Sequence, residues 1–271
     1  MSFPVVFHIL GLALPAHAVF EALAYAVGFR LYLWLRKQSP DPIDDQGRLA
    51  ALIGAIAGAG LGSKLLGFAE HPELWAQTAV NLAAVLSAKS ILGGLLGGLI
   101  GVEIAKKAGG VTRSTGDLYV FPLLTAIIIG RVGCLLTGVS DGTWGDATHF
   151  ILGFDAGDGV KRHPTPLYEI LFLADLALFL RLIRRRLTLR PGDLFRVFML
   201  AYCAWRFVIE FLKPVTTYSI GNDLNSVQNI ATPEALTARP GLSILQLVAL
   251  AGCAAFAVWL RRPKRGGPRG E

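Results

Sequence analysis

The sequence predicts an all-α integral membrane protein with about seven transmembrane helices, its N-terminus outside the cell and its C-terminus in the cytoplasm. Of its 271 residues, 53% are hydrophobic and only 17% are charged, and the mean hydropathy is +0.53. Soluble globular domains do not have this composition. Apolar stretches of roughly 20 residues, the length of a helix that crosses the hydrocarbon core, recur along the chain. No polar stretch is long enough to fold separately, so residues 1–271 are expected to form a single domain.

Seven apolar windows account for the seven predicted spans. They cover about residues 12–37, 48–68, 80–105, 117–138, 166–183, 193–213 and 241–260. The first 11 residues have no basic segment and no small-residue cleavage site after them, so a removed signal peptide is not predicted. The third window contains the glycine run GGLLGGLIG, residues 93–101, which predicts close packing of that helix against a neighbour.

Lysine and arginine are concentrated in every second connection between the predicted spans. This distribution predicts the orientation of the chain in the membrane. The basic segments are 36–48, 106–113, 181–190 and 261–269. The predicted outer loops, at about 139–165 and 214–240, carry few basic residues. The positive-inside rule therefore places the basic segments in the cytoplasm. Membrane topology thus explains the net charge of +7, and a nucleic-acid partner is not expected.

Ionisable side chains inside the apolar windows mark a candidate site, because a charge at bilayer depth costs about 2.5–3.5 kcal/mol on insertion scales. In the stretch AYCAWRFVIEF, Tyr202, Arg206 and Glu210 are spaced i, i+4 and i+8, on one side of a helix. Arg131 lies near the outer end of another window. Two guanidinium groups exceed the charge of one glutamate, so an anionic ligand is expected, and guanidinium forks bind phosphate well. An internal Arg–Glu salt bridge is the purely structural alternative.

Several stretches resemble the bacterial prolipoprotein diacylglyceryl transferase family. They are GRVGC at 130–134, RHPTPLYE at 162–169, FMLAYCAWRFVIEFLKP at 198–214, GSKLLGFAEHPELW at 62–75 and SILGGLLGGLIG at 90–101. The resemblance implies transfer of a diacylglyceryl group from phosphatidylglycerol to the thiol of a lipobox cysteine in a lipoprotein precursor. It also implies a multi-pass location in the bacterial cytoplasmic (inner) membrane.

The resemblance assigns roles to residues of this chain. Arg131 and Arg206 match the family's two functional arginines, which would hold the lipid phosphate and stabilise charge on the leaving group. Tyr202 and Glu210 match a tyrosine and a glutamate on the same helix as the second arginine. The remaining matches are substrate-binding or catalytic positions at the outer ends of spans: His163, Thr165, Tyr168, Glu169 and the loop glycine Gly145.

This chain departs from the family pattern mainly at residues expected to act on the acceptor of the diacylglyceryl group. The histidine of the family's third span falls on Leu92 or Leu96, and the asparagine after its GRxG motif is Cys134 here. Asp141, in a lengthened loop, is the candidate replacement for a family glutamate, and Glu21 falls near a family tyrosine. We therefore expect the lipid donor to be retained while the acceptor, or the group that activates it, has changed.

His17 and Glu21, four residues apart on one helix face, are the candidate replacement base, since a carboxylate beside an imidazole raises its basicity. The alternative is that the two side chains only satisfy each other inside the bundle. The three cysteines, Cys134, Cys203 and Cys253, have no CxxC spacing, so they are interpreted as packing residues and no metal site is predicted.

Two other classes of function stay open at this level. A non-catalytic lipid-binding protein could keep the arginines and lose the chemistry, which the missing histidine would permit. A lipid transporter is less favoured, because the sequence has no internal repeat and its charges gather near the outer ends of spans. Nothing in the sequence requires a soluble cofactor.

Overall fold

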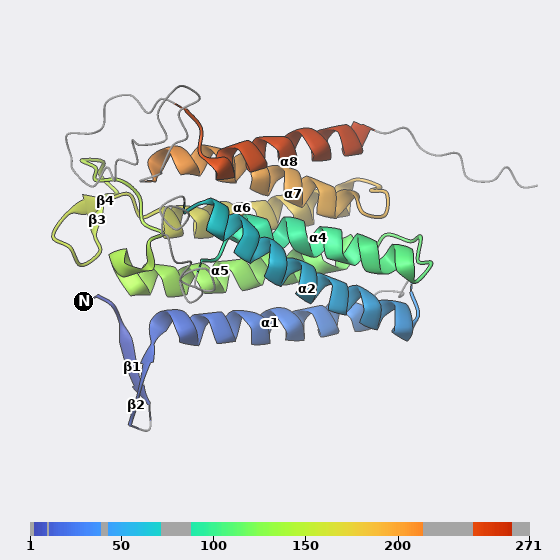
Figure 1. The fold of residues 1–271 in the computed structure, drawn as a ribbon, viewed down its shortest axis with the longest axis horizontal. Coiled ribbons are helices and arrows are strands. Elements are labelled where there is room, and N and C mark those ends of the chain that lie inside the picture. Colours follow the sequence, from blue (N-terminus) through green and yellow to red (C-terminus); the bar gives the residue numbers. More distant parts are fainter. Residues whose placement is uncertain (1–2, 10, 39–42, 72–87, 214–240, 262–271) are drawn as a thin grey trace, which may run out of the picture.

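A computed structural model describes residues 3–9, 11–38, 43–71, 88–213 and 241–261. These residues form a bundle of long helices lying roughly side by side, with two small hairpins at one end (Figure 1). The long helices are α1 (Ala16–Gln38), α2 (Asp45–Ala69), α4 (Ile91–Ala108), α5 (Val120–Thr137), α6 (Thr165–Arg186), α7 (Asp193–Ile209) and α8 (Ile244–Arg261). Short 3-10 turns extend α5 and α7: η2 (Gly116–Tyr119), η3 (Gly138–Asp141) and η4 (Glu210–Leu212).

Each of the seven apolar windows overlaps one of these helices. Four segments are long and apolar enough to cross a membrane: α1, α2, the continuous stretch Gly116–Asp141 and α8. The other three helices differ because α4 and α6 carry more charged side chains and α7 is shorter. The protein is therefore a mostly helical membrane protein with at least these four candidate spans among the residues described.

Two predicted boundaries were wrong. Residues 12–15, expected to open the first helix, form a strand, and α1 begins at Ala16. The third helix was expected from about residue 80, whereas α4 begins at Ile91, after an N-cap at Ser90 whose hydroxyl accepts from the Gly93 amide. Residues 72–87, the predicted outer loop 214–240 and the basic tail 262–269 lie outside the described residues.

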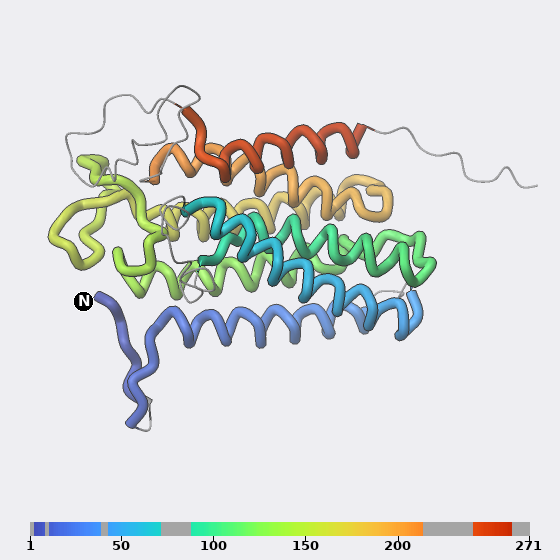
Figure 2. Tube along the Cα trace, viewed as in Figure 1, coloured from blue at the N-terminus to red at the C-terminus, as the bar shows by residue number. Residues whose placement is uncertain are grey.

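The expectation of a purely helical chain is corrected by two hairpins. β1 (Val6–Ile9) pairs antiparallel with β2 (Leu12–Pro15), with Val6 opposite Pro15. β3 (Phe154–Asp155) pairs with β4 (Lys161–Arg162). Both are too short to produce a hydropathy pattern that a window of about 20 residues could detect. Figure 2 shows the N-terminal hairpin projecting from the bundle at the end that also carries the loop between α5 and α6.

The predicted close packing of the glycine run is confirmed, and its partner is α2. Glycines recur every four residues on both helices and meet in antiparallel register: Gly54 against Gly101, Gly58 against Gly97 and Gly62 against Gly93. A Cβ on Gly97 would collide with the Gly58 carbonyl oxygen and lie 2.8 Å from the Gly62 Cα. The absence of side chains therefore lets the two backbones touch, as in membrane helix pairs that use small residues at their interface.

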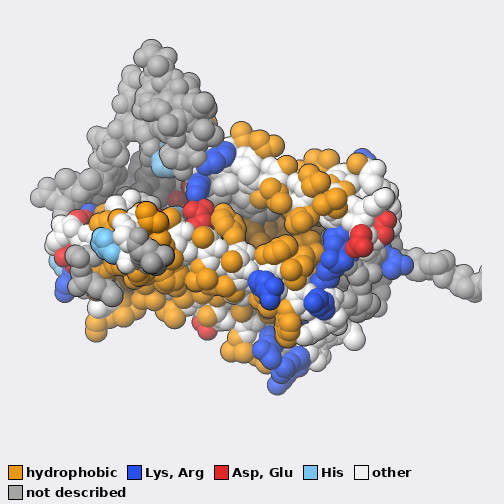
Figure 3. Space-filling model, turned by 90° about the horizontal axis from the view of Figure 1, so that it is seen from below, with side chains coloured by type: hydrophobic (Ala, Val, Ile, Leu, Met, Phe, Trp, Pro, Cys, Tyr) orange, Lys and Arg blue, Asp and Glu red, His pale blue; other side chains and the backbone are white. Residues whose placement is uncertain are grey.

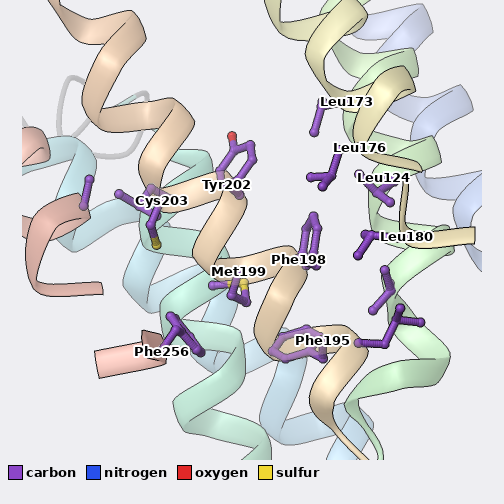
Figure 4. Close-up of a cluster of buried hydrophobic side chains, with 14 of the residues drawn as sticks. Leu124, Leu173, Leu176, Leu180, Phe195, Phe198, Met199, Tyr202, Cys203 and Phe256 are labelled. Atoms are coloured by element: carbon purple, nitrogen blue, oxygen red, sulfur yellow. The ribbon is translucent and has the colours of Figure 1, made fainter. Parts of the chain in front are cut away.

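A cluster of buried hydrophobic side chains lies among α4, α5, α6, α7 and α8 (Figure 4). Phe198, Met199 and Tyr202 of α7 are fully buried in it, against Leu173 and Leu180 of α6. In Figure 4 the Tyr202 hydroxyl points toward the end of the cluster opposite Phe195 and Phe256. The core therefore fixes the helix that carries Tyr202 and Arg206.

The outer surface of the bundle is mainly apolar. Large hydrophobic side chains of α1 and α2 are exposed, including Tyr25, Phe29, Ile56 and Leu65. Figure 3 shows hydrophobic side chains over most of the face seen there, with blue basic groups gathered toward one end and a small charged group near the other. An apolar patch of this extent fits contact with lipid tails rather than with water.

Candidate functional site

Arg131, Glu169 and Arg206 meet inside one end of the bundle. Arg131 Nη2, from the last turns of α5, lies 2.8 Å from Glu169 Oε2 in the second turn of α6. Arg206 Nη1, from the last turn of α7, lies 3.7 Å from the same oxygen. All three side chains are buried, with at most 7% of each exposed. One carboxylate thus holds two guanidinium groups from two different helices.

Tyr202 and Glu210 complete this cluster from the same side of α7 as Arg206. The Tyr202 hydroxyl donates to Glu169 Oε1 over 2.8 Å, and Arg206 Nη2 donates to Glu210 Oε2 over 3.1 Å. The predicted i, i+4, i+8 alignment is therefore found, with η4 continuing the helical path to Glu210. The two arginines that the sequence placed in one site do converge.

The expected charge imbalance between the arginines and a single glutamate is not found. Glu169 was predicted only as a substrate-binding position, yet it is a counter-ion of both arginines, while Glu210 pairs with Arg206. The sequence did not reveal this role because Glu169 lies on α6, and only the packing of α6 between α5 and α7 brings it to Arg131 and Arg206. Two glutamates therefore face two arginines.

The arginines nevertheless retain unused hydrogen-bond donors. Arg131 Nε, Arg206 Nε and Arg206 Nη1 are buried and donate to no acceptor among the described residues. Buried polar groups are nearly always paired, and leaving a donor unpaired costs about 1–3 kcal/mol. Unpaired guanidinium donors from two helices therefore mark a position where an anionic ligand would be stabilised.

Two charged residues beside this cluster were missed by the sequence analysis. Lys213, directly after η4, is buried and interacts electrostatically with Arg206, Glu210, Arg131 and Glu169. Glu70, directly after α2, interacts with Arg206, Glu210 and Lys213. Both lie just beyond helix ends, where a charge in a sequence looks like an ordinary solvated terminus. Their closeness to the arginines could not be read from the chain alone.

A second polar group lies next to the arginine cluster and contains the predicted pair His17 and Glu21. His17 Nε2 lies 3.7 Å from Glu21 Oε2, a long contact, whereas His17 Nδ1 lies 2.8 Å from Asp141 Oδ1. Asp141 Oδ2 in turn accepts from the Thr143 hydroxyl over 2.6 Å. The lengthened loop thus delivers Asp141 to the start of α1, and His17 has a closer carboxylate than the predicted one.

Cys134 connects the two groups. Arg131 Nη1 lies 3.8 Å from Cys134 Sγ, one helical turn further along α5. The Cys134 sulfur, a His17 ring nitrogen and an Asp141 oxygen all lie within 4.8 Å of one another. Cys134 is buried, as a packing residue would be, but its neighbours are polar.

Glu21 also interacts with two residues outside the His17 pair, Lys89 and Tyr25. Lys89 Nζ lies 2.9 Å from Glu21 Oε1, and the Tyr25 hydroxyl donates to the same oxygen over 3.2 Å. Lys89 stands just before α4. The structure makes it a partner of Glu21, while Leu92, at the expected histidine position, is fully buried in the apolar core.

The remaining predicted residues form the rim of the site rather than its centre. His163 Nδ1 lies 3.3 Å from the Tyr168 hydroxyl, and burial lowers the pKa of His163 while the nearby Asp146 carboxylate opposes that change. The Thr165 hydroxyl donates to the Thr143 carbonyl. The described contacts do not join His163, Thr165 or Tyr168 directly to either arginine.

Gly145 is where the loop meets two other segments. Its amide donates to the His163 carbonyl over 2.9 Å, and the next amide, Asp146, donates to the Leu212 carbonyl over 2.8 Å. A Cβ on Gly145 would lie 2.7 Å from the His163 Cβ and 2.5 Å from the Leu212 oxygen. Glycine at this position therefore lets the loop close over the ends of α6 and α7.

Comparison with known proteins identifies relatives over most of the chain. A protein of Dehalococcoides mccartyi named phosphatidylglycerol–prolipoprotein diacylglyceryl transferase is 31% identical over 226 residues, which are 80% of this chain and 85% of that protein. A protein of the same name from Idiomarina loihiensis is 30% identical over 222 residues, 78% of this chain and 80% of its own length. A third, from Tolumonas auensis, is 25% identical over 247 residues, 85% of this chain and 90% of its own length.

The family match extends over nearly the whole chain. Residues 4–260 match the family described as prolipoprotein diacylglyceryl transferase. This range includes α1 to α8 and both polar groups described above, so the match does not depend on one motif. The chain belongs to the prolipoprotein diacylglyceryl transferase family.

Proposed function

We propose that this protein is a diacylglyceryl transferase that moves the diacylglyceryl group of phosphatidylglycerol to the cysteine thiol of a lipoprotein precursor. Family membership and the names of the relatives support the reaction class. The observation that carries the proposal for this chain is the buried cluster of Arg131, Glu169 and Arg206 with its unpaired guanidinium donors. A lipobox cysteine is the proposed acceptor. The changes at residues expected to act on the acceptor leave a different acceptor as the variant of this proposal.

We further propose seven membrane spans, with the N-terminus outside and the C-terminus in the cytoplasm, in the bacterial cytoplasmic membrane. The seven long helices and the alternation of basic connections along the chain support this topology. In Figure 1 the C-terminal ends of α5 and α7 lie at the same end of the bundle as the N-terminal end of α6. The arginine cluster would then lie near the outer leaflet, at the depth of lipid headgroups.

In the proposed reaction Arg131 and Arg206 bind the phosphate of the donor lipid. The acceptor sulfur attacks the glyceryl carbon that carries the phosphate, so that an S–C bond forms while the C–O bond to the phosphate oxygen breaks. The electron pair stays on that oxygen, and glycerol phosphate leaves with one additional negative charge. Buried guanidinium donors in fixed positions stabilise this developing charge, which is the usual source of large rate effects.

Glu169 has a positioning role in this proposal. By accepting from Tyr202 and contacting both arginines, it holds the two forks in fixed relative positions before a lipid arrives. A preorganised pair of donors lowers the cost of ordering the site when the ligand binds. Thr165, Tyr168, His163 and Gly145 would shape the outer rim that covers the headgroup.

The acceptor thiol must lose its proton, and the polar group of His17, Glu21 and Asp141 is proposed to bring this about. This group contacts Arg131 through Cys134 and is therefore adjacent to the proposed phosphate position. Within this group the His17 side chain, on α1, is 38% exposed, so an acceptor could approach it. No histidine occupies the Leu92 position, which makes this group the best-placed one among the described residues.

Complementation tests the proposal against its alternatives. We expect the chain, expressed in a bacterium depleted of its own enzyme, to restore growth and to yield lipoprotein with a thioether-linked diacylglyceryl group, detected by mass spectrometry. A non-catalytic lipid-binding protein would bind phosphatidylglycerol without producing modified lipoprotein. A transporter would move labelled lipid between leaflets of a vesicle without breaking its C–O bond. Either of those results, from correctly inserted protein, would contradict the proposed transfer.

A further inference from the structure

Three potential metal ligands from distant parts of the chain converge beside the arginine cluster. His17 comes from the first turn of α1, Cys134 from the last turn of α5 and Asp141 from the end of η3. Their ligand atoms, a ring nitrogen, a sulfur and a carboxylate oxygen, all lie within 4.8 Å of one another. Tetrahedral zinc, with bonds of about 2.0–2.3 Å, separates its ligand atoms by about 3.3–3.8 Å. A side-chain movement of about 1 Å would therefore close the coordination sphere.

A shared ion would satisfy two polar atoms, His17 Nδ1 and Asp141 Oδ1, that lie close together without a hydrogen bond between them. His17 Nδ1 is buried and only 2.8 Å from Asp141 Oδ1, yet it makes no hydrogen bond, so the carboxylate oxygen does not lie along the N–H direction. Asp141 keeps its other oxygen for the Thr143 hydroxyl, which leaves Oδ1 available for an ion.

The other ring nitrogen of His17 lies near a carboxylate, although beyond hydrogen-bond distance. Nε2 faces the Glu21 carboxylate at 3.7 Å, and Glu21 is itself held by Lys89 and Tyr25. Histidines that bind metals through one nitrogen almost always donate the other N–H to a carboxylate, a carbonyl or water, which fixes the tautomer. The same carboxylate–imidazole pair that suggested a base therefore also fits a ligand whose free nitrogen is Nδ1.

The charges at this position also suit a divalent ion. A Cys134 thiolate and the Asp141 carboxylate would together balance the charge of one dication. Sulfur, imidazole and carboxylate in one site are ligands that zinc accepts together, whereas calcium and magnesium prefer oxygen alone. Three protein ligands would leave one tetrahedral position open, which is the arrangement of catalytic zinc sites.

We propose that His17, Cys134 and Asp141 bind a zinc ion whose open position receives the acceptor thiol. This inference rests on the proposed transferase function for the identity of the incoming ligand, but not for the site itself. On binding zinc the acceptor thiol releases its proton to water and a Zn–S bond forms. The bound sulfur then attacks the glyceryl carbon as described above, and Zn–S cleavage accompanies S–C bond formation.

Metal binding by the purified full chain is the direct test. The protein is prepared in detergent through a tag without histidine, loaded with zinc, freed of unbound metal and measured by atomic emission. We expect about one zinc ion per chain, and a cobalt-loaded sample is expected to show the near-ultraviolet thiolate-to-cobalt absorption band. Wild-type protein that retains no zinc, or cobalt-loaded protein without that band, would overturn the site.

Substitutions at the proposed ligands test which side chains bind the zinc ion. Because Cys134 is buried, Cys134→Ser is paired with His17→Gln, which changes a half-exposed side chain, and both are expected to lose stoichiometric zinc. Glu21→Gln, which acts only through His17, should weaken zinc binding by about 10–100-fold. The matched controls, Cys253→Ser on α8 and His8→Gln on β1, should bind zinc as the wild type does. Equal zinc content in wild type, Cys134→Ser and His17→Gln would contradict the assignment.

The same preparations separate this inference from the proposed function. Lipid transfer to a synthetic lipobox peptide is measured beside zinc content. Zinc bound through Cys134 with no transfer would contradict the transferase function and support the metal site. Transfer by protein that contains no metal would contradict the metal site and support the function, and His17 would then act as a base.

Discussion

Glu169 Oε2 lies 2.8 Å from Arg131 Nη2, so a carboxylate of α6 and a guanidinium of α5 form an ion pair inside the helix bundle. The same oxygen also faces Arg206 of α7. A buried charge that loses its partner is costly, and removing one member of such a pair typically costs about 3–5 kcal/mol. Glu169 therefore connects three helices at the position where the donor phosphate is proposed to bind.

Replacing Glu169 should destabilise the protein strongly. Glu169→Gln leaves Arg131 without its carboxylate, and we expect the free energy of unfolding to fall by about 3 kcal/mol. Asp175→Asn is the matched control, because Asp175 lies on the same helix but is exposed. Unfolding of both variants in detergent should show a large decrease for the first and little change for the second. Equal stability of the two would mean that the ion pair contributes nothing measurable.

The glycine interface between α2 and α4 predicts a contrast between two alanine substitutions. Gly97→Ala places a Cβ against the backbone of Gly58 and Gly62, and overpacking of this kind costs about 1–3 kcal/mol. Gly60→Ala is the control, since a Cβ there meets nothing within 4 Å and the better helix propensity of alanine favours the folded state. Thermal unfolding should therefore give a lower midpoint for Gly97→Ala and an unchanged or higher one for Gly60→Ala. A fall at Gly60 as large as at Gly97 would contradict the interface.

His163 predicts a pH dependence of stability. Burial lowers the pKa of His163 below its ordinary value near 6.5, so the neutral ring is favoured in the folded state. The unfolded chain then binds the proton more readily, and this contribution to stability is complete above about pH 6.5 and is lost as the pH falls below it. We expect the wild type to lose stability relative to His163→Gln as the pH is lowered from 7.5 to 5. A difference that does not change over this range would show that the ring is not buried as described.

The sequence predicted the helices and the convergence of the arginines, for different physical reasons. Long apolar windows predict long helices because a bilayer-spanning segment must satisfy its own backbone hydrogen bonds. Arg206 and Glu210 share a helix face because of simple helical spacing. Arg131 was linked to them by the cost of an unpaired charge and by the family resemblance. Composition and local spacing are enough for these predictions, and in the structure Arg131 and Arg206 contact the same carboxylate.

What the sequence could not predict depends on contacts between distant segments. The bridging position of Glu169 requires α6 to pack between α5 and α7, and the approach of Asp141 to His17 joins residues from the end of η3 and the start of α1. Cys134 looked like a small apolar residue because its polar neighbours are not near it in the sequence, apart from Arg131. The two hairpins are too short to leave a hydropathy signal. The same reasons explain why Lys213 and Glu70 were missed.

The most direct test of the central claim is the transfer reaction of purified arginine variants in vesicles that contain phosphatidylglycerol. If Arg131 and Arg206 stabilise the charge of the leaving phosphate, Arg131→Gln and Arg206→Gln should each lower the transfer rate by about 10²–10³-fold. Lysine at either position should restore only part of it, because an ammonium group lacks the guanidinium fork. Arg181→Gln, an exposed change on α6, is the control and should transfer at the wild-type rate. Wild-type rates in folded Arg131→Gln and Arg206→Gln proteins would contradict the account.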